Sequence, residues 1–147
     1  MTPPAAEAPA TAPAEEGARR SLAGKRLLVV EDELLVSMLL EDILGEFGAE
    51  IAGPHSRLAD GLAAARAERF DGAILDLNLA GQPAEPLADL LLARGVPFVF
   101  ITGYQRDSID RRYANVPVLA KPIDSAALES VLLTLLGGEP LMRAEGN

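Results

Sequence analysis

The stretch LVVEDE, residues 28–33, sets three apolar residues directly against three carboxylates. With the basic residues before it, KRLLVV (25–30) is an apolar run bracketed by charge, which is typical of a strand buried on both faces. Two carboxylates about 4 Å apart repel each other by roughly 4 kcal/mol at an effective dielectric near 20, so something has to offset this cost. This segment alone leaves two explanations open. The acids are solvated at a helix start, which the helix dipole favours, or Glu31 and Asp32 hold a cation together with carboxylates elsewhere.

The composition indicates one folded domain. The 147 residues are 49% hydrophobic, which is enough for a core and leaves almost no room for a second domain. The net charge of -9 would repel a nucleic-acid backbone, so we expect no nucleic-acid partner. The absence of cysteine excludes disulfides, thiolate catalysis and cysteine metal sites. No apolar run approaches the 18 or so residues of a membrane span, so we expect no membrane partner and a cytoplasmic location.

The two ends of the chain differ in composition from its middle. Residues 1–24 are rich in Ala and Pro, contain acids and lack the apolar segment of a signal peptide, which predicts a disordered leader. The folded domain is predicted over 25–137. Residues 138–147 are predicted to be a flexible tail.

Strand-like and helix-like patterns alternate along this domain. Apolar runs predict strands over 25–30, 49–53, 72–79, 96–102 and 117–122. Apolar residues at helical spacing predict helices over 36–47, 56–70, 85–95 and 124–138, with N-caps at Ser56 and at Asp124 or Ser125. The polar segment 103–115 supports at most a short or irregular helix. The alternation predicts an α/β fold with a parallel sheet covered on both faces.

Polar residues interrupt the apolar runs at one consistent place, the carboxyl end of each predicted strand. Glu31 and Asp32 follow the first strand, and Asp76 interrupts the third. Thr102 ends the fourth strand and Lys121 the fifth. Because the carboxyl ends of the strands form the ligand crevice of an open α/β sheet, we expect these side chains to share one site.

The chemistry of these residues is mutually consistent. Two or three carboxylates suit Mg²⁺, a hard cation that prefers oxygen ligands and keeps part of its water shell, and such an ion would relieve the repulsion. Asp76 could then act as a nucleophile toward phosphorus. Lys121 would supply a positive charge, and Thr102 a hydroxyl donor, to the transferred group. As a mere strand-end acid, Asp76 would be partly buried without a partner, which is costly.

Four segments together resemble the receiver domains of two-component response regulators. They are VVEDE, ILDLNL, FITG and AKP, in the family's order and between the expected elements. The resemblance covers about 25–137 and implies a doubly wound, five-stranded parallel sheet of order 2-1-3-4-5. This is a flavodoxin-like three-layer sandwich.

The resemblance also assigns roles at the metal side of the site. Asp76 resembles the phosphoacceptor and a Mg²⁺ ligand. Asp32 looks like a direct Mg²⁺ ligand, and Glu31 like a ligand acting through water. The backbone carbonyl of Asn78 looks like a further ligand.

On the phosphoryl side, Thr102 and Lys121 look like the switch hydroxyl and the phosphate-pairing lysine. The resemblance places Gly103 and Asn78 beside the phosphoryl group. It also implies a cis bond between Lys121 and Pro122, a rare state outside proline peptides.

This chain departs from the family's pattern in two places. The usual aromatic switch residue, three positions before the lysine, is Val118 here. The segment between Thr102 and Lys121 is also short and polar. FITGY resembles a subgroup of stand-alone receivers with a Thr-Gly-aromatic stretch, and we expect that Tyr104 takes over part of the aromatic role.

The function that the resemblance implies is phosphorelay signalling. A sensor histidine kinase or histidine phosphotransfer protein would donate the phosphoryl group, and a change linking Thr102, residues 104–114 and the fifth strand would alter a surface for a downstream protein. We expect no output domain, and no enzyme activity beyond the protein's own phosphorylation and dephosphorylation. Whether the protein is a switch or a phosphate sink stays open.

Two other functions fit these residues less well. An adaptor that no longer accepts phosphate is disfavoured by the retention of Asp76, Thr102 and Lys121. A phosphatase with an aspartate nucleophile usually has a second acid two residues later, where this chain has Asn78, and it carries cap insertions that do not fit this length.

Five other ionisable positions are expected to lie outside the site. Glu33 is predicted to be a solvated residue of the first helical turn, and His55 a loop residue. The arginines at the polar segment are expected to form a solvated face: Arg106, Arg111 and Arg112.

Overall fold

The computed structural model describes residues 21–103 and 109–137. Five parallel strands form its main sheet in the order β2-β1-β3-β6-β7. Their bounds are β1 (Arg26–Val30), β2 (Glu50–His55), β3 (Gly72–Asp76), β6 (Phe98–Thr102) and β7 (Val118–Ala120). Counted along the main sheet, this is the predicted order 2-1-3-4-5, so the doubly wound, flavodoxin-like fold is confirmed.

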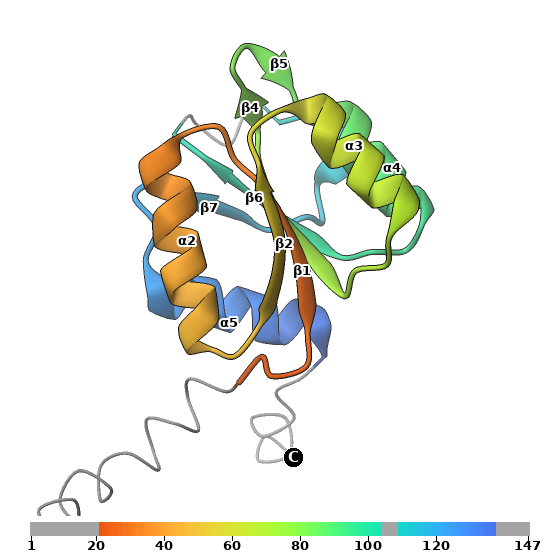
Figure 1. Ribbon diagram of the computed structural model, residues 1–147. Helices are drawn as coiled ribbons and strands as arrows, with labels where there is room; N and C mark the ends of the chain where they lie inside the picture. The colour runs from red at the N-terminus through yellow and green to blue at the C-terminus, as the bar shows by residue number, and fades with distance from the viewer. Residues whose placement is uncertain (1–20, 104–108, 138–147) are drawn as a thin grey trace, which may run out of the picture.

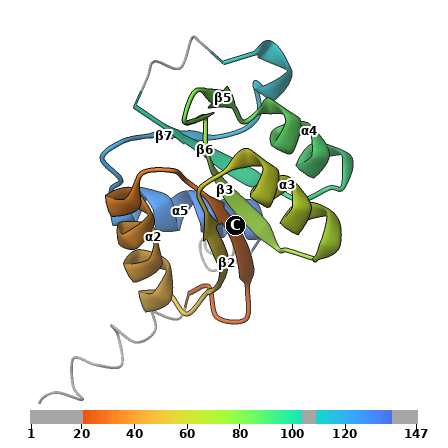
Figure 2. The same ribbon diagram turned by 45° about the horizontal axis from the view of Figure 1, so that its top comes forward.

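Within the described residues, four α-helices cover the two faces of the sheet (Figures 1 and 2). One face carries α2 (Leu34–Glu46) and α5 (Ser125–Leu136), and the other carries α3 (Leu58–Ala67) and α4 (Glu85–Ala93). Alternate residues of β1 serve the two faces: Leu27 and Val29 pack with α2 and α5, whereas Leu28 and Val30 pack with α3 and α4. The central strands are therefore buried on both sides, as their continuous apolar sequences predict.

Two helix starts test the predicted caps. The Asp124 side chain accepts a 2.9 Å hydrogen bond from the Ala127 N–H, so Asp124 is the N-cap of α5. Ser56 is not the cap of α3, because this helix begins two residues later and the cap position belongs to Arg57. Ser56 therefore lies outside the position from which a side chain reaches the first free N–H groups.

The second strand continues further than predicted. β2 includes Pro54 and His55, and the N–H of Glu31 donates a 2.9 Å hydrogen bond to the His55 carbonyl. The prediction of a loop at His55 was wrong because the register between β1 and β2 shifts after Leu28, which lets the edge strand continue past Pro54.

The third apolar run is shorter as a strand than predicted. β3 ends at Asp76, and the chain then forms a small antiparallel hairpin of β4 (Asn78–Leu79) and β5 (Gln82–Pro83). The two linking residues, Ala80 and Gly81, have φ values of 51° and 88°, as a tight two-residue hairpin turn requires. In Figure 1 this hairpin lies at the end of the sheet where the parallel strands finish.

Two segments outside the main strands and helices also differ from simple expectation or remain short. Leu22 is buried, and its N–H donates to the Phe47 carbonyl at 2.8 Å, so the core begins before the predicted boundary at residue 25. The polar segment contains only a short 3-10 turn, η3 (Arg111–Tyr113), within its described part. Tyr104 and Arg106 lie outside the described residues. None of the helices over the described ranges is both long and apolar enough to cross a membrane.

Candidate functional site

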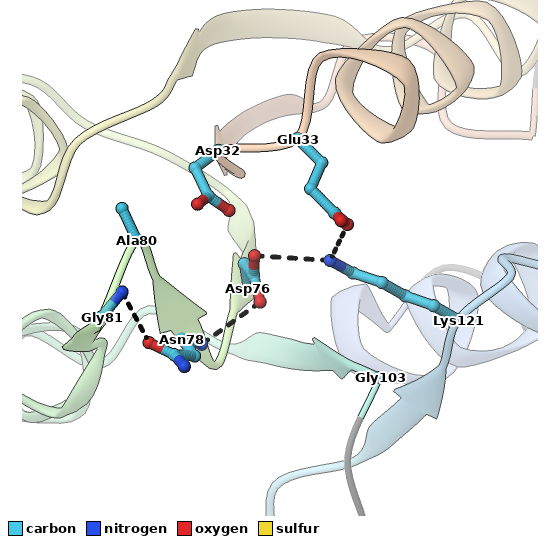
Figure 3. A pocket seen from close by; sticks show the side chains of 8 residues that line it. All are labelled: Asp32, Glu33, Asp76, Asn78, Ala80, Gly81, Gly103 and Lys121. Atoms are coloured by element: carbon cyan, nitrogen blue, oxygen red, sulfur yellow. Dashed lines mark hydrogen bonds and ion pairs between the residues drawn. The ribbon is translucent and has the colours of Figure 1, made fainter.

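The polar strand ends meet at one edge of the sheet, as predicted (Figure 3). They border a pocket of about 420 Å³. Its lining comes from the ends of β1, β3, β6 and β7 and from the β4–β5 hairpin: Asp32, Glu33, Asp76, Asn78, Ala80, Gly81, Gly103 and Lys121. The sequence therefore identified most of this pocket, but not the contributions of Glu33, Ala80 and Gly81.

Three carboxylates gather in this site. Oxygens of Glu31, Asp32 and Asp76 all lie within 4.8 Å of one another. Glu31 and Asp76 are only 1% and 4% exposed, so water cannot screen their repulsion fully. The Glu31 Oε1 atom is also buried, and within the described residues it has an ion pair with Lys121 but no well-aligned hydrogen bond. Such a set of oxygens could hold a hard divalent cation.

Lys121 is the cation that faces this acidic group. Its Nζ atom lies 3.4 Å from Asp76 Oδ2 and 3.2 Å from Glu31 Oε1. A third carboxylate, that of Glu33, lies nearer, with its Oε1 atom 2.6 Å from Nζ. Glu33 lies at the start of α2, as its N-cap residue, with a side chain 60% exposed, which agrees with the predicted solvated residue at the helix start. The expectation that Glu33 lies outside the site was wrong, because its side chain reaches across to Lys121.

The electrostatic environment of the pocket shifts the pKa values of Asp76 and Lys121. Burial, the neighbouring Asp32 carboxylate and the charge of Glu31 raise the pKa of Asp76 to about 7, although the Asn78 N–H and Lys121 act in the opposite direction. Burial alone would lower the pKa of Lys121, but the carboxylates of Glu33, Asp76 and Glu31 outweigh it and raise that pKa. The charged form of Asp76 is therefore disfavoured, whereas the charged form of the neighbouring Lys121 is favoured.

The β4–β5 hairpin fixes one side of Asp76. The Asn78 N–H donates a 3.2 Å hydrogen bond to Asp76 Oδ1, and the Asn78 side-chain oxygen accepts one of 3.1 Å from the Gly81 N–H. Figure 3 shows both bonds, with Lys121 approaching Asp76 from the opposite side. The turn thereby holds the backbone of Asn78 at the pocket.

The carboxyl ends of β6 and β7 form the opposite wall of the pocket. Thr102 is 2% exposed, and its carbonyl accepts a 2.9 Å hydrogen bond from the Lys121 N–H. Gly103 follows at the pocket surface, and no described residue other than its chain neighbours lies within 4 Å of the point where a side chain would begin. The bond between Lys121 and Pro122 is cis, as predicted, and Gly53–Pro54 is a second cis bond that the sequence did not predict.

A second ionic cluster, outside this pocket, was missed from the sequence. Arg112 lies 3.1 Å from Asp89, 3.4 Å from Asp110 and 3.6 Å from Glu85. Tyr113 is 2% exposed, and its hydroxyl donates a 2.6 Å hydrogen bond to Asp89 Oδ1. Arg106, Arg111 and Arg112 were predicted to form a solvated face, with no ion pair to α4. The one signal for this contact in the sequence was an aromatic residue in a polar stretch.

Comparisons with known proteins identify the family. SdrG from Sphingomonas melonis Fr1 is 40% identical over 79% of this chain and 98% of that chain, with a TM-score of 0.69. The chain belongs to the response regulator receiver family. A BeF3-activated conformation of SdrG, recorded for Pseudomonas melonis Fr1, is 41% identical over 78% of this chain and 98% of that one, with a TM-score of 0.67.

Other receivers share the fold. The CheY-like receiver domain protein from Methanospirillum hungatei JF-1 is 25% identical over 77% of this chain and 94% of that chain, with a TM-score of 0.68. The receiver domain of a sensor histidine kinase from Pseudomonas aeruginosa PAO1, 24% identical over 78% and 99% with a TM-score of 0.68, holds a magnesium ion in its active site cleft. A search of protein-family models gave no match, and neither did a search of curated proteins. The receiver family is thus established through solved structures.

Proposed function

We propose that this receiver accepts a phosphoryl group on Asp76 in the presence of Mg²⁺. One observation carries the proposal: a buried carboxylate with a raised pKa lies 3.4 Å from a lysine, inside a pocket at the carboxyl edge of the sheet. A buried acid of this kind is costly to maintain, and perturbed groups of this kind cluster at functional sites.

The residues of the pocket fit Mg²⁺. The donors are carboxylate oxygens, and the buried Glu31 Oε1 atom has an ion pair with Lys121 but no well-aligned hydrogen bond within the described ranges. Asp32 and Asp76 would bind the ion directly, Glu31 through water, and Asn78 through its carbonyl. When bound, the ion would supply positive charge that offsets the mutual repulsion of these acids and the charge of the incoming phosphoryl group.

The transfer itself is an exchange of two bonds at phosphorus. An Asp76 oxygen forms the new P–O bond while the P–N bond of a phosphohistidine breaks, and the bonding electron pair remains on the imidazole nitrogen. Lys121 offsets negative charge on the phosphoryl oxygens, and the Thr102 hydroxyl and Gly103 N–H donate hydrogen bonds to them. Water later attacks phosphorus, which releases inorganic phosphate and restores the carboxylate.

The partners follow from this chemistry. The donor would be a sensor histidine kinase or a histidine phosphotransfer protein. Phosphorylation adds nearly two negative charges at Asp76, and a change from Thr102 through η3 to β7 would alter a surface that a downstream protein binds. The existence of a BeF3-activated form of SdrG supports a phosphorylation-dependent change in this family.

Intact mass spectrometry tests the proposal. Incubation with acetyl phosphate and Mg²⁺ should add the mass of one phosphoryl group to the wild type and to Asp89→Asn, whose substituted acid lies outside the pocket. Asp76→Ala should gain nothing, and omission of Mg²⁺ should slow the gain strongly. An equal gain in Asp76→Ala, or no gain in the wild type, would contradict the proposal and favour an adaptor function.

A phosphatase function predicts a different result. Catalytic amounts of the protein would then hydrolyse a generic phosphate ester over many turnovers. A receiver should not hydrolyse such an ester over many turnovers, because its phosphoryl donor is a phosphohistidine or a small acyl phosphate. Asn78 occupies the position where such phosphatases usually carry their second acid, so we expect no turnover.

A further inference from the structure

The shortest contact of Lys121 is made with a residue that has no role in the proposed transfer. Glu33 Oε1 lies 2.6 Å from Lys121 Nζ, whereas the Asp76 oxygen lies 3.4 Å away. The lysine side chain is 16% exposed and that of Glu33 is 60% exposed. The lysine therefore pairs most closely with the carboxylate at the mouth of the pocket.

The position of Glu33 is set by its backbone. It is the N-cap residue of α2 in an extended conformation, and its side chain makes no capping hydrogen bond with the helix. Its N–H donates a 2.8 Å hydrogen bond to Glu31 Oε2. These features leave the side chain to cross the pocket mouth to Lys121, 88 residues away (Figure 3).

Lys121 cannot keep its present arrangement once a phosphoryl group is attached to Asp76. The group brings nearly two charges and three acceptor oxygens to the carboxylate that is now the most distant of the three partners. Of these partners, Glu33 is the one that solvent can hydrate after release, because Glu31 is fully buried. Of the three ion pairs of Lys121, the pair with Glu33 therefore costs the least free energy to break.

We propose that Glu33 competes with the phosphoryl group for Lys121. It is a positioning residue that holds the lysine toward the pocket mouth before phosphorylation and releases it afterwards. This inference rests on the proposed function of Asp76 and adds a residue that sets how readily the phosphoryl state forms.

Beryllofluoride, a phosphoryl mimic, tests the competition without a donor protein. With Mg²⁺ present, Glu33→Gln should bind beryllofluoride about 2–5-fold more tightly than the wild type, as expected for loss of one partly exposed ion pair. Isothermal titration calorimetry measures this affinity. Glu41→Gln is the matched control, because Glu41 is exposed on the same helix and has no ion pair among residues 21–103 and 109–137. It should bind like the wild type.

Glu33→Asp separates competition from a simple charge effect. It keeps the negative charge but shortens the side chain by one methylene, which withdraws the carboxylate from Lys121. Competition predicts that Glu33→Asp also binds more tightly, as Glu33→Gln does. Tighter binding by Glu33→Gln alone would show that only the local charge matters, and this would overturn the inference.

Two further outcomes would also overturn it. If the wild type binds beryllofluoride and Glu33→Gln binds equally or more weakly, Glu33 does not compete for Lys121, and the proposed function of Asp76 is untouched. If the wild type does not bind beryllofluoride with Mg²⁺, the proposed function fails and this inference fails with it. Urea unfolding of each variant checks that an affinity change does not arise from lost structure.

Discussion

In the part of the chain that the structure describes, two clusters have one cation that faces three carboxylates, and the acids in them differ in how they bind protons. Lys121 lies among Glu31, Glu33 and Asp76, with its side chain 16% exposed and that of Asp76 only 6% exposed. Arg112 lies among Glu85, Asp89 and Asp110, with every one of these side chains more than 40% exposed. The number of ion pairs is the same, but the access of water differs.

The pKa values of the two aspartates show what this difference means. Burial and neighbouring acids raise the pKa of Asp76 to about 7, whereas the Tyr113 hydroxyl, together with Arg112, lowers the pKa of Asp89. The carboxylate charges around Lys121 are therefore poorly balanced, and those around Arg112 are well balanced. A buried acidic group that its own lysine does not balance is a candidate for chemistry, and a solvated, balanced group is a brace between η3 and α4.

The largest predicted contrast is in phosphorylation. Lys121→Met should slow the gain of mass from acetyl phosphate roughly 100-fold, because one charged contact to the transferred group is lost. Arg112→Met should stay within about twofold of the wild type, since a solvated ion pair outside the pocket does not touch the reacting atoms. Initial rates of mass gain in excess Mg²⁺ measure both. Equal slowing of the two variants would erase the contrast.

The second contrast is in stability without Mg²⁺. The folded-state pKa of Asp76 is raised from 3.8 to about 7, so the folded protein binds its proton more tightly than the unfolded chain, and stability falls as the pH rises from about 4 to 7. Asp76→Asn removes this cost and should stabilise the protein by about 1–2 kcal/mol at pH 8, with the gain disappearing toward pH 4.

The matched substitution should have the opposite sign. Because its folded-state pKa is lowered, Asp89 stabilises the fold above the unfolded-state pKa, and Asp89→Asn should destabilise it at pH 8. Urea unfolding at several pH values measures both variants. If both move in the same direction at pH 8, the distinction between the two clusters is wrong.

The smallest effect concerns Tyr113. Tyr113→Phe removes the hydroxyl that donates to Asp89 but keeps the ring that packs edge to face on Phe100 at 5.4 Å. We expect a loss of about 1 kcal/mol of unfolding free energy and an unchanged rate of phosphoryl gain. A slower phosphoryl gain in Tyr113→Phe would show that the hydrogen bond between Tyr113 and Asp89 also affects the pocket.

The two clusters were not equally visible in the sequence. The sequence placed five residues in one site because they interrupt or end apolar strands at their carboxyl ends, and the fold brings those ends to one edge. These residues are Glu31, Asp32, Asp76, Thr102 and Lys121. The contact between Asp89 and Arg112 joins an exposed helix position to a 3-10 turn. No periodic pattern marks such a pair, so it could not be predicted.

Two local features were also not predicted from the sequence, because each depends on the position of single residues. Glu33 was assigned to the helix because a first-turn acid is common there, and only the three-dimensional path of Lys121 reveals their 2.6 Å contact. The hairpin after Asp76 was hidden because LNL continues the apolar run of β3, and the turn depends on the backbone conformation of Ala80 as well as Gly81. Sheet order depends on long patterns, whereas these features depend on single residues.

The central claim is that the buried cluster carries the phosphoryl group on Asp76, and locating that group tests it most directly. Borohydride reduces an acyl phosphate to an alcohol, which would convert the phosphorylated aspartate into homoserine. After treatment with acetyl phosphate and Mg²⁺, reduction and peptide sequencing by mass spectrometry should find homoserine at position 76. Homoserine at Asp32 or Asp89 instead, or at no position in protein that has gained the phosphoryl mass, would contradict the claim.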